Sequence, residues 1–216
     1  MSAKTRFAAM SRRAAITATA LTAMVALAGC NNGGAGGPAE GDMAMGAPEG
    51  AKVTVVEYAS VTCHVCEAWQ KENWEAFKAA YVDTNKVRYV FREIPTPPAE
   101  IAIAGFLVAR CAGSDKYFDV IHELLASRQE FVTDPRSTLF RVGNGAGLSN
   151  ERVQQCITDE AALAAAEERA QAARSAGVDS TPTFLVNGTK IITPGSQSGP
   201  SMADLSKAID AELAKD

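Results

Sequence analysis

Two kinds of apolar pattern alternate along the chain from about residue 51 to its end. Short runs rich in valine and aromatic residues predict strands, and they lie at 52–58, 86–94, 184–186 and, more briefly, 190–192. Longer segments carry apolar residues at a spacing of three or four, which predicts helices. These segments lie at about 65–82, at 99–112 and 114–127, from about 149 onward, and at 159–176 and 202–215.

The order of these elements predicts the class of fold. Strands separated by helices indicate a sheet with parallel members and helices packed on its faces. Asn187-Gly188 predicts a closing hairpin, which makes the sheet mixed. Pro95 and the prolines after it end the second strand, and a block of helices is expected after them, over about 98–177. We therefore predict an α/β fold with a mixed central sheet and flanking helices.

The first 29 residues have the pattern of an export signal. Four basic residues precede an apolar run over 14–28, and this run is shorter than the roughly 20 residues of a membrane-spanning helix. It ends in Leu27-Ala28-Gly29-Cys30, which resembles the bacterial lipobox, where cleavage falls before a cysteine that then carries lipid. An ordinary cleavage site beside an unmodified cysteine is the alternative. We expect 1–29 to be a lipoprotein signal peptide and Cys30 to be lipidated.

The next segment is expected to be a linker. Residues 31–50 contain seven glycines, a composition typical of a flexible tether. We therefore assign 30–50 to the lipidated cysteine and its tether, and 51–216 to the folded domain.

Net charge argues against two classes of partner. Loss of residues 1–29 removes four of the 21 basic residues and none of the 25 acidic ones, which leaves a charge near −8. An acidic domain is a poor candidate for binding nucleic acid or an anionic membrane surface. Lipid, rather than charge, would hold this protein at a membrane.

The cysteines carry the candidate chemistry. Besides Cys30 the chain has four: Cys63 and Cys66 three positions apart, and Cys111 and Cys156 far apart. Export places them in an oxidising compartment. Cys63 and Cys66 lie where the first strand passes into the first helix, and there the helix N-terminus favours a thiolate at Cys63. A protonated His64 would add to that effect.

Two other interpretations of the Cys63/Cys66 pair remain. A purely structural disulfide is one, although so short a ring constrains little of the chain. A metal site is the other, but zinc or copper would need more ligands than His64 and His122 offer. We expect no metal and no cofactor.

A resemblance to a known family supports the redox interpretation. The strand containing Glu57, the Cys63-His64-Val65-Cys66 motif, the helical block and the segment 177–188 together resemble the DsbA-like thiol–disulfide oxidoreductases. The resemblance covers about 51–216. It implies a thioredoxin-like fold with an inserted helical domain, in a lipoprotein form.

The resemblance also implies roles for individual residues. Thr181-Pro182 resembles the cis-proline loop that faces the two cysteines, whereas an ordinary X–Pro bond is usually trans. Glu57 resembles the buried acid that shuttles protons to Cys66; the alternative is a solvated edge-strand glutamate. Cys111 and Cys156 are implied to form a structural disulfide, against two buried free thiols. The histidine follows the first cysteine here, whereas it precedes the second in the best-known members.

These expectations combine into a function. We expect a monomeric periplasmic enzyme, lipid-anchored to a membrane, that exchanges the Cys63–Cys66 disulfide with cysteines of reduced exported proteins, most simply as an oxidase recycled by a membrane redox partner. The alternatives are a reductase or isomerase of the same fold, and a non-catalytic metal- or peptide-binding module.

Overall fold

The computed structural model describes residues 36–215. The predicted signal peptide and Cys30 lie outside the described residues. All described residues belong to one compact unit, Asn32–Asp216. In the described part of the chain, no helix is both long and apolar enough to cross a membrane.

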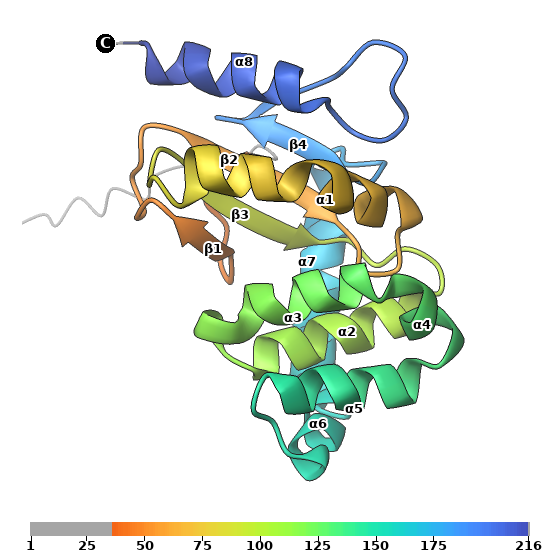
Figure 1. Ribbon diagram of the computed structural model, residues 1–216. Coiled ribbons are helices and arrows are strands. Elements are labelled where there is room, and N and C mark those ends of the chain that lie inside the picture. Colours follow the sequence, from red (N-terminus) through yellow and green to blue (C-terminus); the bar gives the residue numbers. More distant parts are fainter. Residues whose placement is uncertain (1–35, 216) are drawn as a thin grey trace, which may run out of the picture. The chain divides into compact units, whose positions relative to one another are not determined.

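A five-stranded mixed sheet forms the centre of the fold (Figure 1). Its strand order is β1-β3-β2-β4-β5, with β2 and β3 parallel and the other neighbours antiparallel. The strands are β1 (Met43–Gly46), β2 (Thr54–Ala59), β3 (Arg88–Glu93), β4 (Thr183–Val186) and β5 (Thr189–Lys190). The predicted α/β class and mixed sheet are therefore confirmed.

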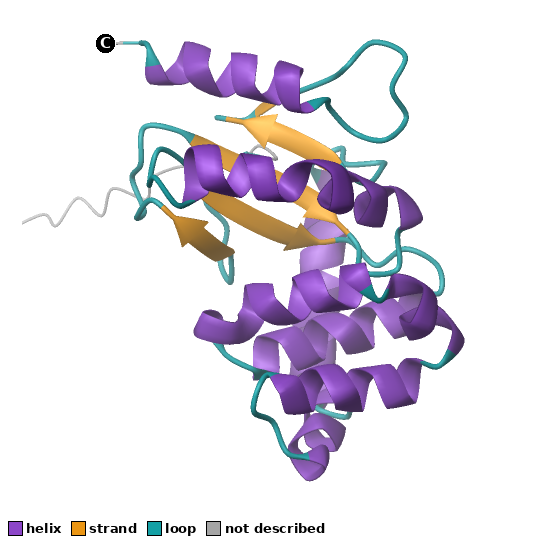
Figure 2. Ribbon diagram, in the orientation of Figure 1, coloured by secondary structure: helices purple, strands orange, loops and turns teal. Residues whose placement is uncertain are grey.

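Alternation along the strands divides the core between the two faces of the sheet. Val55, Tyr89 and Phe184 belong to the larger cluster, which includes apolar residues of α1 (His64–Phe77) and α8 (Met202–Leu213). Val56, Val90 and Leu185 point the other way and pack with Ala173 of α7 (Glu160–Ser175). Figure 2 shows the same layering, with α1 and α8 on one side of the strands and α7 on the other. A short π-helical turn, Lys78–Val82, extends α1.

The helical insertion lies between β3 and β4, as predicted. It consists of α2 (Ala99–Cys111), α3 (Ser114–Ala126), α4 (Arg128–Thr133), α5 (Pro135–Gly145), α6 (Asn150–Ile157) and α7. The pattern of apolar residues did not predict α4 and α5. Asp134 caps α5 by accepting a hydrogen bond from Ser137 N–H, with Pro135 at the first helical turn. Gly143 allows α6 to approach closely, since a Cβ there would lie 2.5 Å from Val153 Cγ2.

The predicted tether over 30–50 is wrong for the residues that the structure describes. Met43–Gly46 forms β1, which pairs with β3 at the edge of the sheet. Arg92 of β3 donates hydrogen bonds to both carboxylate oxygens of Asp42, at 2.8 Å each, and to Gly37 O. Arg110 donates to Gly41 O. Glycine content suggested a linker, but contacts from distant arginines order this segment.

Candidate active site

The first helix begins at Cys63, at the end of a tight turn that follows β2. Cys63 N–H donates to Ser60 O at 3.1 Å, and Cys63 has extended backbone angles as the N-cap of α1. Its sulfur accepts a hydrogen bond from Cys66 N–H at 3.2 Å. A helix N-terminus leaves such N–H groups unsatisfied, so the thiolate of Cys63 completes the cap.

The two thiols are unbonded in the structure, and they have different environments. Cys63 is 8% exposed to solvent, and Cys66 is 1% exposed. The pKa of Cys63 is lowered to about 6, and the hydrogen bond from the Cys66 thiol has the largest effect. Burial raises this pKa. The Thr181 hydroxyl and the backbone N–H groups of Cys66 and Val65 lower it further. Burial and the neighbouring Cys63 sulfur raise the pKa of the Cys66 thiol well above its usual value. One thiol is therefore a thiolate at neutral pH and the other is protonated.

The loop before β4 faces Cys63 from across the sheet. The Thr181–Pro182 peptide bond is cis. Thr181 Oγ1 donates to Cys63 Sγ at 3.4 Å, and Thr181 O lies 3.7 Å from the same sulfur. Strand pairing explains this contact between residues 118 positions apart, because β4 runs antiparallel to β2 with Thr183 opposite Tyr58.

Glu57 lies on β2, an interior strand, so it is not a solvated edge-strand residue. It is buried, and its Oε2 accepts a hydrogen bond of 2.5 Å from the hydroxyl of Tyr89 on β3. Burial raises the pKa of Glu57, Tyr89 lowers it, and the charge of Cys63 raises it, with a result of about 7. The same carboxyl raises the pKa of Cys66, so the acid and the buried thiol interact.

His64 is at the first position of α1, and its side chain is exposed. The donors around the Cys63 sulfur are the Cys66 thiol, the Thr181 hydroxyl and backbone N–H groups. His64 is therefore adjacent to the pair in the chain but is not among the groups that shift the Cys63 pKa.

Hydroxyl groups support the turn before Cys63, and sequence reasoning missed them. Thr62 Oγ1 donates to Thr96 O at 2.8 Å and lies 2.9 Å from Thr96 Oγ1. Ser60 Oγ lies 3.1 Å from Thr62 Oγ1 and accepts a hydrogen bond from Thr96 N–H. Thr62 directly precedes Cys63, which was the available signal, but Thr96 is brought to it only by the fold.

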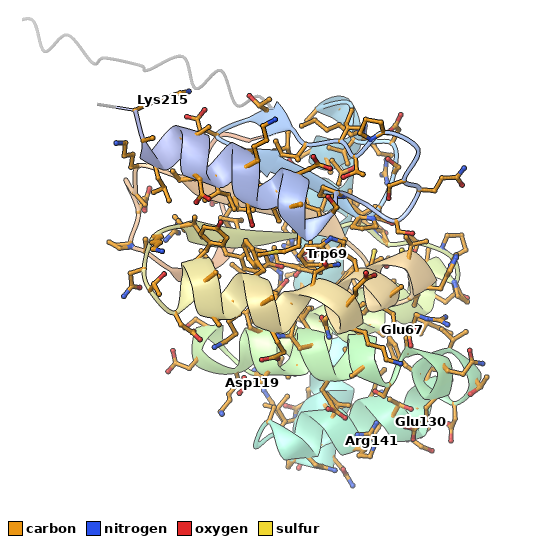
Figure 3. All side chains as sticks on the ribbon, turned by 45° about the horizontal axis from the view of Figure 1, so that its top comes forward. Glu67, Trp69, Asp119, Glu130, Arg141 and Lys215 are labelled. Atoms are coloured by element: carbon orange, nitrogen blue, oxygen red, sulfur yellow. A yellow bond between two sulfur atoms is a disulfide. The ribbon has the colours of Figure 1, made fainter. Side chains whose placement is uncertain are left out.

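Trp69 connects the first helix to the loop before α8. Its indole N–H donates to Pro200 O at 2.8 Å, and its ring centroid lies 4.3 Å from that of Phe184. In the same loop, a Cβ on Gly199 would lie 2.9 Å from Pro182 Cγ. Figure 3 shows that Trp69 and Glu67 leave α1 on different sides, and Glu67 pairs with Arg128 of the insertion at 2.5 Å. The helix is thus anchored to both neighbouring parts of the fold.

The other two cysteines among the described residues are bonded to each other. A disulfide joins Cys111, at the end of α2, to Cys156 on α6. Both helices belong to the insertion. Within residues 36–215, no group of three or more histidine, cysteine or acidic side chains is arranged to hold a metal ion.

This arrangement can carry out thiol–disulfide exchange. A stabilised thiolate is both a nucleophile and a good leaving group. A buried, protonated second thiol needs a proton acceptor before it can attack in turn, and Glu57 has a suitable pKa and position.

Comparisons with known proteins agree with this geometry. The family model described as Thioredoxin matches residues 38–211. A protein of Rickettsia typhi named as a protein-disulfide oxidoreductase is 31% identical over 179 residues, which cover 80% of this chain but 62% of that protein. The chain therefore spans less than two thirds of this relative's length.

Two solved structures share the fold. Wolbachia pipientis alpha-DsbA1 has a TM-score of 0.71 at 22% identity, over 82% of this chain and 92% of that one. BdbD from Bacillus subtilis has a TM-score of 0.68 at 18% identity, over 81% and 94% of the two chains. The family match shows that the chain belongs to the thioredoxin family, and its fold is similar to that of these two structures.

Proposed function

We propose that this protein is an exported thiol–disulfide oxidoreductase that oxidises cysteine pairs in other exported proteins. The observation that carries the proposal is the Cys63 sulfur. It caps α1, its pKa is about 6, and it faces the cis Thr181–Pro182 loop. The name of the Rickettsia typhi relative agrees with this chemistry.

The mechanism follows from the two environments. In the oxidised enzyme, a client thiolate attacks Cys63 Sγ, and a bond forms between the client sulfur and Cys63. The Cys63–Cys66 bond breaks, Cys66 leaves as a thiolate, and it takes a proton from the Glu57 carboxyl. A second client thiolate then attacks the first client sulfur, and Cys63 leaves as the stabilised thiolate. The client is oxidised by two electrons, and the enzyme is reduced by two.

Direction depends on the stability of the reduced enzyme. A low thiolate pKa stabilises the reduced form and makes the disulfide a stronger oxidant. The lowered pKa of Cys63 supports a reactive disulfide, and we propose the oxidising direction, which the redox potential of the pair tests against a reductase of the same fold. Turnover then needs a partner that accepts the two electrons, which we propose to be a membrane redox protein.

Trapping of client proteins tests the function. Cys66→Ser leaves the reactive Cys63 but removes the thiol that releases a bound client, so disulfide-linked complexes should accumulate. Cys63→Ser should trap nothing and abolish disulfide transfer to a reduced client. Transfer retained in Cys63→Ser would refute the mechanism. If Cys66→Ser traps no client and Cys63→Ser leaves the clients' disulfides unchanged, the non-catalytic binding module would be favoured.

We further propose a periplasmic location, with a lipid on Cys30, a monomeric state and a structural role for the Cys111–Cys156 disulfide. The lipobox-like sequence before Cys30 supports the anchor. Release of Cys30→Ser from the membrane fraction is the expected result, and unchanged fractionation would refute the anchor. A mass by light scattering that corresponds to two copies would favour the isomerase alternative.

A further inference from the structure

A buried tyrosine lies beside the acid that serves the redox pair. Glu57 and Tyr89 sit on the neighbouring parallel strands β2 and β3, where Tyr89 pairs with Val55 and Phe91 pairs with Glu57. Since alternate residues of a strand share a face, Tyr89 and Phe91 point to the same side of the sheet as Glu57. The Tyr89 hydroxyl therefore reaches the Glu57 carboxyl diagonally, at 2.5 Å.

The packing of the Tyr89 ring does not require a hydroxyl group at this position. Its ring is fully packed, 5.1 Å from Trp74, 5.6 Å from Phe77 and 5.8 Å from Phe118, measured between ring centroids. A phenylalanine would satisfy these contacts equally well. A buried phenol costs free energy unless it is hydrogen-bonded, and the Glu57 carboxyl is the partner that it meets.

We propose that Tyr89 is a positioning residue for proton exchange between Glu57 and Cys66, because its hydroxyl holds Oε2 of the carboxyl and leaves Oε1 for the transferred proton. The inference rests on the proposed thiol exchange and deepens it. When Cys66 attacks the mixed disulfide at Cys63, the Cys66 thiol gives its proton to the Glu57 carboxylate. The new Cys66–Cys63 bond forms as the bond from Cys63 to the client sulfur breaks, and the client leaves as a thiolate. The oxidising direction reverses each transfer.

The charged and titratable groups around Glu57 are consistent with this role. The α1 helix contributes Cys63 and Cys66, and β3 contributes Tyr89. From α3, Tyr117 and His122 lie behind Tyr89: Tyr117 acts on the Tyr89 hydroxyl electrostatically, and the His122 ring lies 4.2 Å from Trp74. Burial lowers the pKa of His122 to about 4, so it is neutral where Glu57 titrates. Tyr89 is then the donor that stabilises the ionised carboxylate.

The test is the pH dependence of the resolving step, in which Cys66 displaces a thiol from a preformed mixed disulfide on Cys63. In the native protein, the rate should rise with pH through a midpoint somewhat below the value of about 7 that the Glu57 pKa has beside the Cys63 thiolate, because Cys63 carries no charge in the mixed disulfide. Tyr89→Phe removes the hydroxyl that stabilises the carboxylate, so the midpoint should move to higher pH by about one unit, a tenfold change in proton affinity. Glu57→Gln should remove the midpoint, and adding Tyr89→Phe to it should change nothing further.

A matched control exists in the same protein. Tyr117 is equally buried, and its hydroxyl donates to Glu93 Oε1 at 2.9 Å, so Tyr117→Phe loses the same kind of bond away from the redox pair. Because the Tyr117 hydroxyl bonds Glu93 and not Glu57, the midpoint in Tyr117→Phe should move much less than in Tyr89→Phe. An unmoved midpoint in folded Tyr89→Phe, or an equal shift in Tyr117→Phe, would overturn the proposal.

A second measurement does not depend on the stability of Tyr89→Phe. Fluorotyrosine is a more acidic phenol and a stronger donor, so its site-specific incorporation at position 89 alone should move the midpoint to lower pH. A midpoint that does not move in this direction would overturn the proposal. If Cys66→Ser forms no mixed disulfide at all, the proposed function fails instead, which distinguishes the two failures.

Discussion

At the Cys63 sulfur, three kinds of donor oppose the cost of burial. The Cys66 thiol comes from the next turn of the helix, the Thr181 hydroxyl comes from across the sheet, and backbone N–H groups come from the helix start. Each stabilises the thiolate, because a charged acceptor gains more from a hydrogen bond than a neutral one. Only the backbone and Cys66 donors are local in sequence. Thr181 therefore links the chemistry of the first helix to the loop before β4.

The redox potential should report this thiolate directly. Above the Cys63 pKa of about 6, the reduced enzyme carries one more proton than the oxidised enzyme, on Cys66. Below that pH it carries two. A two-electron couple changes by about 30 mV per proton and pH unit, so the potential should fall by about 30 mV per unit near neutral pH and by about 59 mV per unit in acid.

Equilibration with glutathione across this pH range measures the slope. Thr181→Val removes one donor, so the change of slope should move to higher pH. A single slope of about 59 mV through neutral pH would mean that Cys63 keeps an ordinary pKa. The value itself decides direction: near about −120 mV it supports an oxidase, and near about −270 mV a reductase.

The segment before β2 shows how an element can be made by partners distant in the chain. The apolar side chains of this segment that pack against the core, Met43, Ala44 and Met45, are only partly buried, and β1 is only four residues long. Arg92 holds the segment through Asp42 and also donates to the Tyr58 hydroxyl at 2.8 Å. These side chains are largely buried, with exposures of 12% for Arg92 and 14% for Asp42. Removing one partner of so shielded an ion pair costs more than removing one partner of a surface pair, because it leaves a charge that is neither solvated nor paired.

Asp42→Ala should therefore destabilise the domain by about 2 kcal/mol, because the buried guanidinium of Arg92 loses the carboxylate that neutralises it. We place the value below the roughly 3–5 kcal/mol of fully buried pairs, since both groups keep some contact with water. Urea unfolding measures the change.

Asp83→Ala is the matched control. Asp83 pairs with Lys78 at 2.6 Å, but these side chains are 52% and 33% exposed, and exposed pairs contribute at most about 1 kcal/mol. Equal, small effects of the two variants would show that Asp42 does not hold the segment.

On the scale of the whole unit, different interactions stabilise the sheet and the helical insertion. Strand pairing stabilises the sheet, and a disulfide links two helices of the insertion. Pairing of β2 with β3 and β4 joins residues far apart in the chain. The insertion is helical, and a disulfide closes 45 residues of it between Cys111 and Cys156. Glu93 at the end of β3 binds Arg110 of α2, Arg169 of α7 and Tyr117 of α3, so one buried carboxylate connects the sheet to three helices.

Replacement of Cys111 and Cys156 by alanine should lower the free energy of unfolding by about 4 kcal/mol, because the open loop regains chain entropy in the unfolded state. The comparison is best made with Cys63 and Cys66 both changed to serine, so that the only disulfide difference is the one tested. Urea unfolding under oxidising conditions measures it. A change below about 1 kcal/mol would argue against a structural role for this bridge.

Local patterns were sufficient for most of the fold. The valine-rich runs and helical spacings predicted β2, β3, β4 and α8 to within a few residues, since the strands are almost continuously buried and α8 buries one face. They missed α4, which has only six residues and buries only Phe131, and α5, where Thr138 and Gly143 occupy buried positions beside Leu139 and Val142 and so weaken the apolar pattern. They also misassigned β1 to a tether, because its order depends on Arg92.

By itself, the sequence determined the class of fold, the position of Cys63 at a helix start and the family resemblance. These properties depend on local patterns and short spacings, which can be recognised in a segment without knowledge of its tertiary contacts. Tertiary structure decided the surroundings of the sulfur: Thr181 donates from 118 residues away, Tyr89 holds Glu57 from the next strand, and His64 is directed to solvent. Such contacts depend on strand register, and register is determined only when the sheet and its core form together.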